Sequence, residues 1–287
     1  MDNTHLSIRS MEPRGFVRRI AIGVTVFALA GVAASCRQSP PSSVEERPDF
    51  GHYFEAAGTA GTFVLYDPTE EKYLAHDLER ANQRFIPAST FKILNSLIAL
   101  ETGVVADTLD LFEWDGVERS VGQWNRDHTL ATAFEYSVVW VYQRIAREIG
   151  ESRMRDFVMR SGYGNADIDG GIDTFWLAGD LRISPMEQIR FLRRLHERSL
   201  PFAERSIDIV EGIMVEDRGP GYVLYAKSGL ADETPHDVGW YVGFVTGSDS
   251  SESRTYYFAL EMDIDTADQI SSRRGIARSI LADLDIL

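Results

Sequence analysis

The stretch "IPASTFKILNSLIAL" (residues 86–100) places a serine three residues before a lysine, with a long apolar run behind them. Positions i and i+3 share one face of a helix, so the Ser89 hydroxyl and the Lys92 amine are expected to meet. Ser89 follows Pro87 and stands where the helix should begin. Unpaired backbone N–H groups there favour developing negative charge. The pair is therefore a candidate nucleophile with its base.

Lysine is scarce in this chain, which makes its positions informative. Of the 29 basic residues only three are lysines, namely Lys72, Lys92 and Lys227, and the other 26 are arginines. Arginine stays protonated in proteins, whereas a buried lysine can lose its proton and act as a base. The apolar neighbours of Lys92 favour that role. Taken alone, the stretch also fits a lysine that extends along its apolar stem from a helix to solvent.

A second lysine stands in the strand-like segment "YAKSGL" (residues 225–230). A lysine beside a hydroxyl suits the binding of a carboxylate or the relay of a proton. Gly229 lets a substrate lie close along the edge of a strand. Two of the three lysines thus have a serine nearby, which points to one site built from both.

The order of these motifs is similar to that of penicillin-recognising serine enzymes. In detail the chain resembles the class D (oxacillinase-type) β-lactamases over roughly residues 55–285. The matching segments are "PASTFK" (87–92), "SVV" (137–139), "YGN" (163–165) and "KSG" (227–229). The resemblance implies an α+β protein with the serine β-lactamase and penicillin-binding transpeptidase-like fold. That fold has a central antiparallel sheet, terminal helices and a helical lobe.

The resemblance also implies roles for the nucleophile and its base. Ser89 would attack the β-lactam carbonyl and form an acyl-enzyme. Lys92 would carry a CO2-derived carbamate (N6-carboxylysine) as general base, which requires a neutral amine. CO2 or bicarbonate would be needed for this modification, and no separate cofactor is implied. Val139, Trp176 and Leu177 would line the pocket of Lys92, with the Trp176 indole N–H donating to the carbamate.

Further residues match the family's substrate-binding positions. Ser137 would relay a proton to the leaving nitrogen, and Lys227, also a catalytic residue, would help bind the substrate carboxylate together with Ser228 and Arg273. The substrate-binding set would be Ser228, Gly229, Leu230 and Arg273, with the oxyanion held by the backbone N–H groups of Ser89 and Leu230. Arg274 is adjacent, so the arginine assignment could shift by one residue.

The first 35 residues are expected to be a signal peptide. Three arginines (Arg14, Arg18, Arg19) precede an uncharged run from Ile20 to Ser35, which is short for a membrane span. The true start is Met1 or Met11. Cys36 stands where a bacterial lipoprotein would be acylated, although Ala33 occupies a position where leucine is usual. A lipid-anchored and a soluble exported protein are both open, and either would be periplasmic.

The rest of the chain is expected to hold a polar tether (residues 36–54) and one catalytic domain (residues 55–287). Strands are predicted over 61–67 and 72–77, and mainly helices from about 120 to 200. The segments 237–247 and 254–265 should form a hairpin, and a final helix should run over about 267–285. "TLATAFEYSVVWVYQRIAREIG" (129–150) reads as continuous helical periodicity.

Several functions are disfavoured by composition. A net charge of −15 argues against nucleic acid as a partner. The six histidines have no paired spacing, so no metal site is predicted. The alternatives to a hydrolase of β-lactams are a sensor domain that is acylated without turnover, and a peptidoglycan carboxypeptidase or transpeptidase. Such sensors hang from several membrane spans, whereas this chain shows only a signal-like segment. The Tyr-Gly-Asn and Trp176 matches count against the third function. Oligomeric state and the preferred β-lactam are not predicted.

Overall fold

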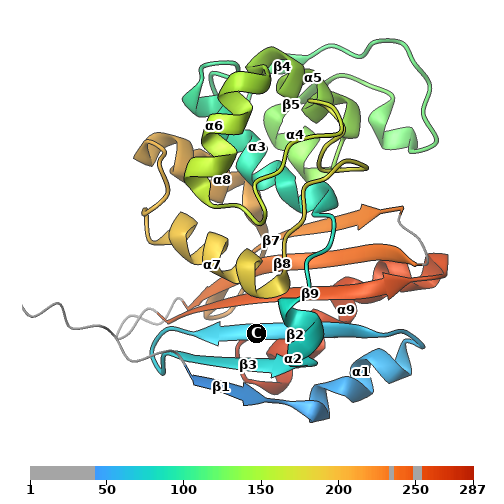
Figure 1. The fold of residues 1–287 in the computed structure, drawn as a ribbon, viewed down its shortest axis with the longest axis vertical. Coiled ribbons are helices and arrows are strands. Elements are labelled where there is room, and N and C mark those ends of the chain that lie inside the picture. Colours follow the sequence, from blue (N-terminus) through green and yellow to red (C-terminus); the bar gives the residue numbers. More distant parts are fainter. Residues whose placement is uncertain (1–42, 233–235, 248–253) are drawn as a thin grey trace, which may run out of the picture. The chain divides into compact units, whose positions relative to one another are not determined.

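A seven-stranded sheet forms the base of the molecule in the computed structural model, which describes residues 43–232, 236–247 and 254–287 (Figure 1). Within these residues the strand order is β1-β3-β2-β9-β8-β7-β6. Neighbouring strands run antiparallel except β1, which pairs parallel to β3. The strands are β1 (Ser43–Glu46), β2 (Gly61–Asp67), β3 (Lys72–His76), β6 (Val215–Gly219), β7 (Tyr222–Ala231), β8 (Asp237–Gly247) and β9 (Thr255–Ile264). The α+β fold and the 237–265 hairpin are confirmed, with a parallel edge strand added to the predicted antiparallel sheet.

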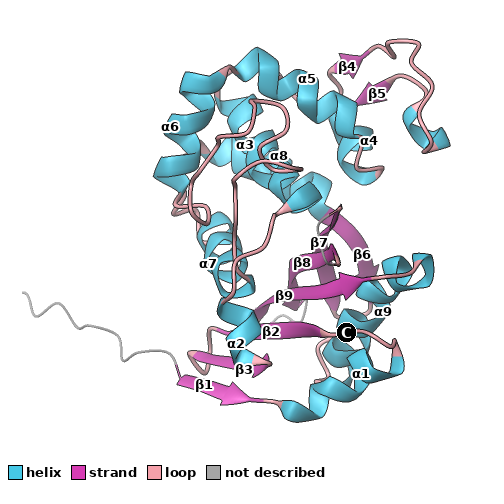
Figure 2. Cartoon of the chain, turned by 45° about the vertical axis from the view of Figure 1, so that its right-hand side comes forward, coloured by secondary structure: helices cyan, strands magenta, loops and turns pink. Residues whose placement is uncertain are grey.

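Alternating side chains of the sheet enter two cores. On β2, Val64 and Tyr66 belong to the core shared with the helical lobe, whereas Phe63 and Leu65 belong to the core on the other face. This period of two is the reason why both faces of the strand are apolar. The second face is covered by α1 (Gly51–Ala56) and by the C-terminal helix α9 (Ala267–Asp283) (Figure 2).

The helical lobe lies beside the first face of the sheet (Figure 1). Its first helix is α3, which the short 3-10 turn η2 precedes and which holds the nucleophile motif. A two-stranded ribbon, β4 with β5, and a short turn, η3, edge the lobe. The elements are η2 (Ala88–Phe91), α3 (Lys92–Glu101), β4 (Leu111–Phe112), η3 (Gly122–Trp124), β5 (His128–Thr129), α4 (Leu130–Glu135), α5 (Val139–Ile149), α6 (Glu151–Ser161), α7 (Pro185–His196) and α8 (Glu204–Met214).

The folded body begins earlier than predicted. Residues 43–54 were expected to be tether, but β1, the turn η1 (Pro48–Phe50) and most of α1 occupy them. Phe50 and Phe54 explain the difference, because both are 2 % exposed and anchor this polar segment in the second core. A short helix, α2 (Leu78–Asn82), follows β3. The predicted signal peptide and Cys36 lie outside the described residues. No helix in the described part of the chain is long and apolar enough to cross a membrane.

The helical pattern predicted over residues 129–150 is interrupted. Helix α4 ends at Glu135 and α5 begins at Val139, and Ser137 in the link has a φ of 55°. This left-handed conformation is unfavourable for a residue with a Cβ and stops the helix. Hydrophobic periodicity could not reveal the break, since the apolar residues on both sides keep helical spacing. The consequence is that Ser137 lies in a half-buried turn instead of on a helix face.

Candidate active site

The nucleophile turn brings Ser89 and Lys92 together as predicted. Lys92 Nζ donates to Ser89 Oγ at 2.6 Å, and Ser89 is 8 % exposed. The residue before the serine, Ala88, has a φ of 49°, so the backbone at the nucleophile is held in an unfavourable region. The turn thus presents a hydroxyl at the edge of the core with an amine behind it.

The Lys92 amine is in a setting that keeps it neutral. Its side chain is fully buried, and its ammonium position lies 5.2 Å from the centre of the Tyr142 ring. Burial is the main cause that lowers the pKa of Lys92 well below its usual value, and the nearby Lys227 lowers it further. Desolvation disfavours the charged form of a lysine. A neutral amine beside Ser89 can accept a proton or react with CO2.

Lys227 on β7 meets Ser137 across the site. Its Nζ donates to Ser137 Oγ at 3.1 Å and to the carbonyl oxygen of Ser228 at 3.1 Å. Burial first, and then the positive charges of Arg274 and Arg273, lower the pKa of Lys227 to about 7, while Glu216 opposes the shift. The left-handed turn at Ser137 is what aims its hydroxyl at a strand 90 residues away.

Strand β7 packs directly against the nucleophile turn. A Cβ on Gly229 would lie 3.2 Å from the Pro87 carbonyl oxygen and 3.2 Å from Thr90 Cγ2, which is tighter than ordinary contact. A residue without a side chain is therefore needed here. This packing brings the β7 backbone at Gly229 and Leu230 alongside the turn that carries Ser89.

The two neighbouring arginines on α9 take different places. Arg273 is 8 % exposed, and its guanidinium donates to the Gly229 carbonyl oxygen and to that of Ile270 (2.7 Å). Burial, and then Arg274, lowers the pKa of Arg273 to about 10. Arg274 is exposed and pairs with Glu216 at 3.3 Å. The predicted Arg273 therefore contacts the binding strand, and its neighbour faces the pocket.

The Tyr-Gly-Asn motif fixes the loop that carries Trp176. Tyr163 is fully buried, with its hydroxyl 3.4 Å from Thr90 Oγ1 in the nucleophile turn. Gly164 has a φ of 56°, and a Cβ there would lie 2.0 Å from the Arg182 carbonyl oxygen. Asn165 accepts from the backbone N–H of Arg182 at 2.9 Å and donates to the carbonyl of Asp180 at 2.8 Å. The motif thus clamps both ends of the loop over residues 165–182.

Trp176 carries a polar group whose partner is missing from the described residues. Its side chain is fully buried and stacks on Phe91, the residue before Lys92, with ring centres 5.4 Å apart. The indole Nε1 is buried and has no hydrogen-bond acceptor in the described part of the chain. An unsatisfied buried donor is costly. Leu177 packs against the same core, and Val139 is half-buried at the start of α5. A carbamate on Lys92 fits this donor set.

Two tryptophans that sequence reasoning left without a role hold the loop before α4. Trp124 Nε1 donates to the carbonyl oxygen of Tyr136, and Trp140 Nε1 donates to that of Trp124, each at 2.9 Å. Tyr136 is the residue before Ser137, so the first bond fixes the left-handed turn. Gln188 was also missed, and its amide donates to Thr90 Oγ1 at 2.8 Å. A tryptophan in an otherwise polar loop was the signal that could have found Trp124.

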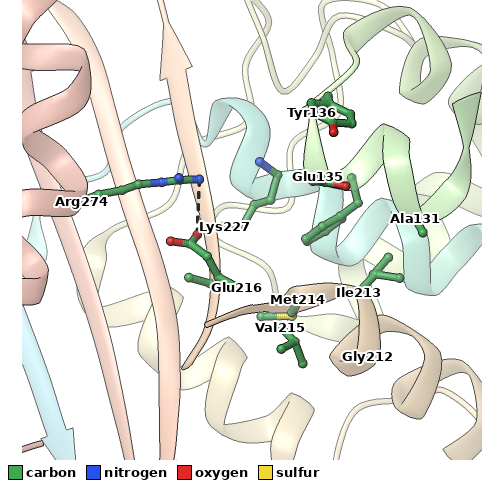
Figure 3. Close-up of a pocket in the computed structure, with 12 residues that line it drawn as sticks. Ala131, Glu135, Tyr136, Gly212, Ile213, Met214, Val215, Glu216, Lys227 and Arg274 are labelled. Atoms are coloured by element: carbon green, nitrogen blue, oxygen red, sulfur yellow. Dashed lines mark ion pairs between the residues drawn. The ribbon is translucent and has the colours of Figure 1, made fainter. Parts of the chain in front are cut away.

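A cavity of about 580 Å³ adjoins Lys227 (Figure 3). It lies between α4, the end of α8, β6, β7 and α9. Its lining comprises Ala131, Phe134, Glu135, Tyr136, Gly212, Ile213, Met214, Val215, Glu216, Ala226, Lys227 and Arg274. No group of three or more His, Cys, Asp and Glu side chains that could hold a metal ion occurs in the described ranges. The site therefore offers two serine–lysine pairs beside a pocket with mixed charge.

A Ser-x-x-Lys turn packed against a Lys-Ser-Gly strand defines the class of the penicillin-binding transpeptidases. The family model described as "Penicillin binding protein transpeptidase domain" matches residues 61–282. The chain is 43% identical over 237 residues to β-lactamase OXA-48 of Klebsiella pneumoniae, covering 83% of this chain and 88% of that protein. It is 40% identical over 243 residues to the probable β-lactamase YbxI of Bacillus subtilis, covering 84% and 89%.

Similar solved structures identify the group within this family to which the chain is related. The class D β-lactamase YbXI from Nostoc superposes with a TM-score of 0.80 at 42% identity, covering 83% of this chain and 99% of that chain. FUS-1 (OXA-85), a class D β-lactamase from Fusobacterium nucleatum, superposes with a TM-score of 0.81 at 35% identity, covering 85% and 100%. The chain belongs to the class D β-lactamases, which are serine hydrolases of β-lactams. The resemblance stated from the motifs is confirmed.

Proposed function

We propose that this chain is an exported enzyme that opens the ring of penicillin-type antibiotics through an acyl-enzyme on Ser89, and thereby confers resistance. The observation that carries the proposal is the contact of 2.6 Å between Lys92 Nζ and Ser89 Oγ, with Lys92 fully buried. A nucleophile within hydrogen-bond reach of a neutral base is the arrangement that acyl transfer needs.

Acylation uses both serine–lysine pairs. Ser89 Oγ attacks the β-lactam carbonyl carbon and loses its proton to the Lys92 side chain. The ring C–N bond breaks, and Ser137, hydrogen-bonded to Lys227, delivers a proton to the leaving nitrogen. The ring carboxylate is held by Lys227, Ser228 and Arg273 at the β7 edge. Backbone N–H groups of Ser89 and Leu230 hold the oxyanion, and each such donor typically contributes ~10²–10³ in rate. Water then attacks the acyl carbon and releases Ser89.

Carboxylation of Lys92 is part of the proposal. CO2 adds to the neutral amine, and the carbamate would supply a carboxylate base beside Ser89. The buried amine with its lowered pKa and the Trp176 indole donor, which has no acceptor within the described residues, support it, and Val139 and Leu177 would line the pocket. CO2 or bicarbonate is then required, and no separate cofactor.

The test mixes the purified protein with a chromogenic cephalosporin and a penicillin, with and without bicarbonate. Hydrolysis should be lost in Ser89→Ala and in Lys92→Ala. Lys72→Ala is the matched control, since this third lysine lies on β3 and pairs with Glu45 at the surface. A stable acyl adduct on Ser89 without turnover would refute the hydrolase and favour the sensor function. Turnover indifferent to bicarbonate would contradict the carboxylated lysine.

The signal-like first 35 residues support export. We propose a periplasmic location, with a lipid on Cys36 as the alternative to a soluble form. Fractionation of cells that express the wild type or Cys36→Ala separates the two. A soluble wild type would exclude the anchor, and release from the membrane only in the variant would support it.

A further inference from the structure

One wall of the cavity next to Lys227 carries an ion pair that the proposed reaction does not use. Arg274 Nη2 lies 3.3 Å from Glu216 Oε2, and both residues line the cavity next to Lys227 (Figure 3). The Tyr241 hydroxyl donates to the other carboxylate oxygen of Glu216 at 2.8 Å, and Tyr241 is fully buried. The Glu216 carboxylate is thus held in place by the buried Tyr241 side chain.

The two side chains of this ion pair differ in their exposure to solvent. The Glu216 side chain is 22 % exposed, whereas that of Arg274 is 55 % exposed. Arg274 also lies over the Tyr241 ring, 6.0 Å from its centre. Removing Arg274 would leave Glu216 in place as an uncompensated charge. Removing Glu216 would release a long, mobile cation into the pocket.

The charges around Lys227 explain why the pairing of Glu216 with Arg274 affects the charge of the cavity. Arg273 and Arg274 are positive groups near it, and Glu216 is negative, with Glu135 at the rim of the cavity (Figure 3). Arg273 is held at the Gly229 carbonyl. Glu216 therefore decides whether the pocket presents a further free cation beside the carboxylate-binding end.

We propose that Glu216 is a specificity-determining residue that neutralises Arg274, so that Lys227 and Arg273 are the only cations that bind the ring carboxylate and a positively charged group next to that carboxylate is accepted. The inference rests on the proposed function. The substrate class it names is β-lactams with a cationic substituent on the carbon beside the carboxylate-bearing carbon, as in cephalosporins with a pyridinium group there. A free Arg274 would repel such a group, and a free Glu216 would attract it.

The test compares two cephalosporins with the same acylamino side chain, one with a pyridiniummethyl and one with a neutral acetoxymethyl substituent. For each protein the readout is the ratio of kcat/KM for the cationic to that for the neutral substrate. A ratio cancels any loss of folded protein. Glu216→Gln should lower the ratio and Arg274→Gln should raise it, each by roughly three- to tenfold, the effect of one partly screened charge at the pocket edge. The double variant should return close to the wild-type ratio, as coupled partners do.

Glu204→Gln is the matched control, because it removes the same charge from an exposed position at the start of α8. Its ratio should equal that of the wild type. Equal ratios in all variants, or shifts of the same sign for Glu216→Gln and Arg274→Gln, would overturn the inference while leaving hydrolysis intact. If the wild type neither hydrolyses nor is acylated by either substrate, the proposed function fails and this inference fails with it.

Discussion

Replacing Trp176 by phenylalanine tests the carboxylation of Lys92 most directly. The substitution keeps a ring against Phe91 and removes only the indole with its N–H. In the structure that N–H is buried without an acceptor in the described residues, a state that costs about 1–3 kcal/mol. Without CO2 the relief of this cost and the lost packing oppose each other. The stability of the variant should therefore differ from that of the wild type by under about 2 kcal/mol.

With bicarbonate the two proteins should diverge. A hydrogen bond to a charged acceptor contributes about 1.5–3 kcal/mol. Since about 1.4 kcal/mol corresponds to a factor of ten, the bicarbonate concentration for half-maximal effect should rise roughly 10- to 100-fold in the variant. The assay is thermal unfolding in CO2-free buffer with added bicarbonate, because a group that modifies only the folded state raises Tm with concentration. Carbon-13 NMR with labelled bicarbonate gives a second readout that is independent of activity.

Trp114→Phe serves as the control. Trp114 is a partly exposed tryptophan whose indole donates to the Val117 carbonyl at 3.1 Å. Its loss should leave the bicarbonate dependence unchanged. The reasoning is refuted if Trp176→Phe and the wild type respond to bicarbonate at the same concentration by both readouts.

Three further predictions follow from other parts of the site. In the free enzyme kcat/KM should fall as pH rises through about 7, because Lys227 then loses the proton with which it binds the substrate carboxylate. This fall at high pH should vanish in Lys227→Arg, and an unchanged pH profile in the variant would contradict the role of Lys227. Gly164→Ala should destabilise the protein by at least about 2 kcal/mol, seen as a lower Tm, because of the positive φ of Gly164 and the clash of a Cβ with the Arg182 carbonyl. The control Gly212→Ala lies in a helix with open space around it and should be neutral or stabilising by up to about 1 kcal/mol, so equal Tm changes in the two variants would refute the argument. Trp124→Phe should lower kcat roughly fivefold, about 1 kcal/mol, by freeing the turn before α5, and an unchanged kcat in stopped-flow turnover would exclude this positioning role.

The catalytic residues could be predicted because they are closely spaced in the sequence or belong to motifs that follow one another in a recognisable order along the chain. Ser89 and Lys92 are three residues apart, so helical geometry alone places them together. The resemblance assigned both Lys227 and Ser137 to the site, but their direct contact was not predicted, since nothing local connects a strand with a turn 90 residues earlier. The start of the fold was placed too late, because two buried phenylalanines outweigh a polar composition that reads as tether.

Other features depend on tertiary contacts that no pattern encodes. The left-handed conformation of Ser137 results from packing on both sides of the link, and the hydrogen bond from Trp124 is visible only once the loop is placed. Likewise, adjacent arginines on one helix are equivalent in sequence, and the sheet edge decides that Arg273 is buried and Arg274 meets Glu216.

The scarcity of lysine makes this enzyme suitable for selective isotope labelling of its active site. Growth on isotopically labelled lysine would introduce only three labelled side chains. Two of these, Lys92 and Lys227, lie in the active site, and Lys72 at the surface provides an internal reference. Protonation, carboxylation and acylation could then be followed as separate resonances during turnover, with no spectral crowding and no substitution in the protein.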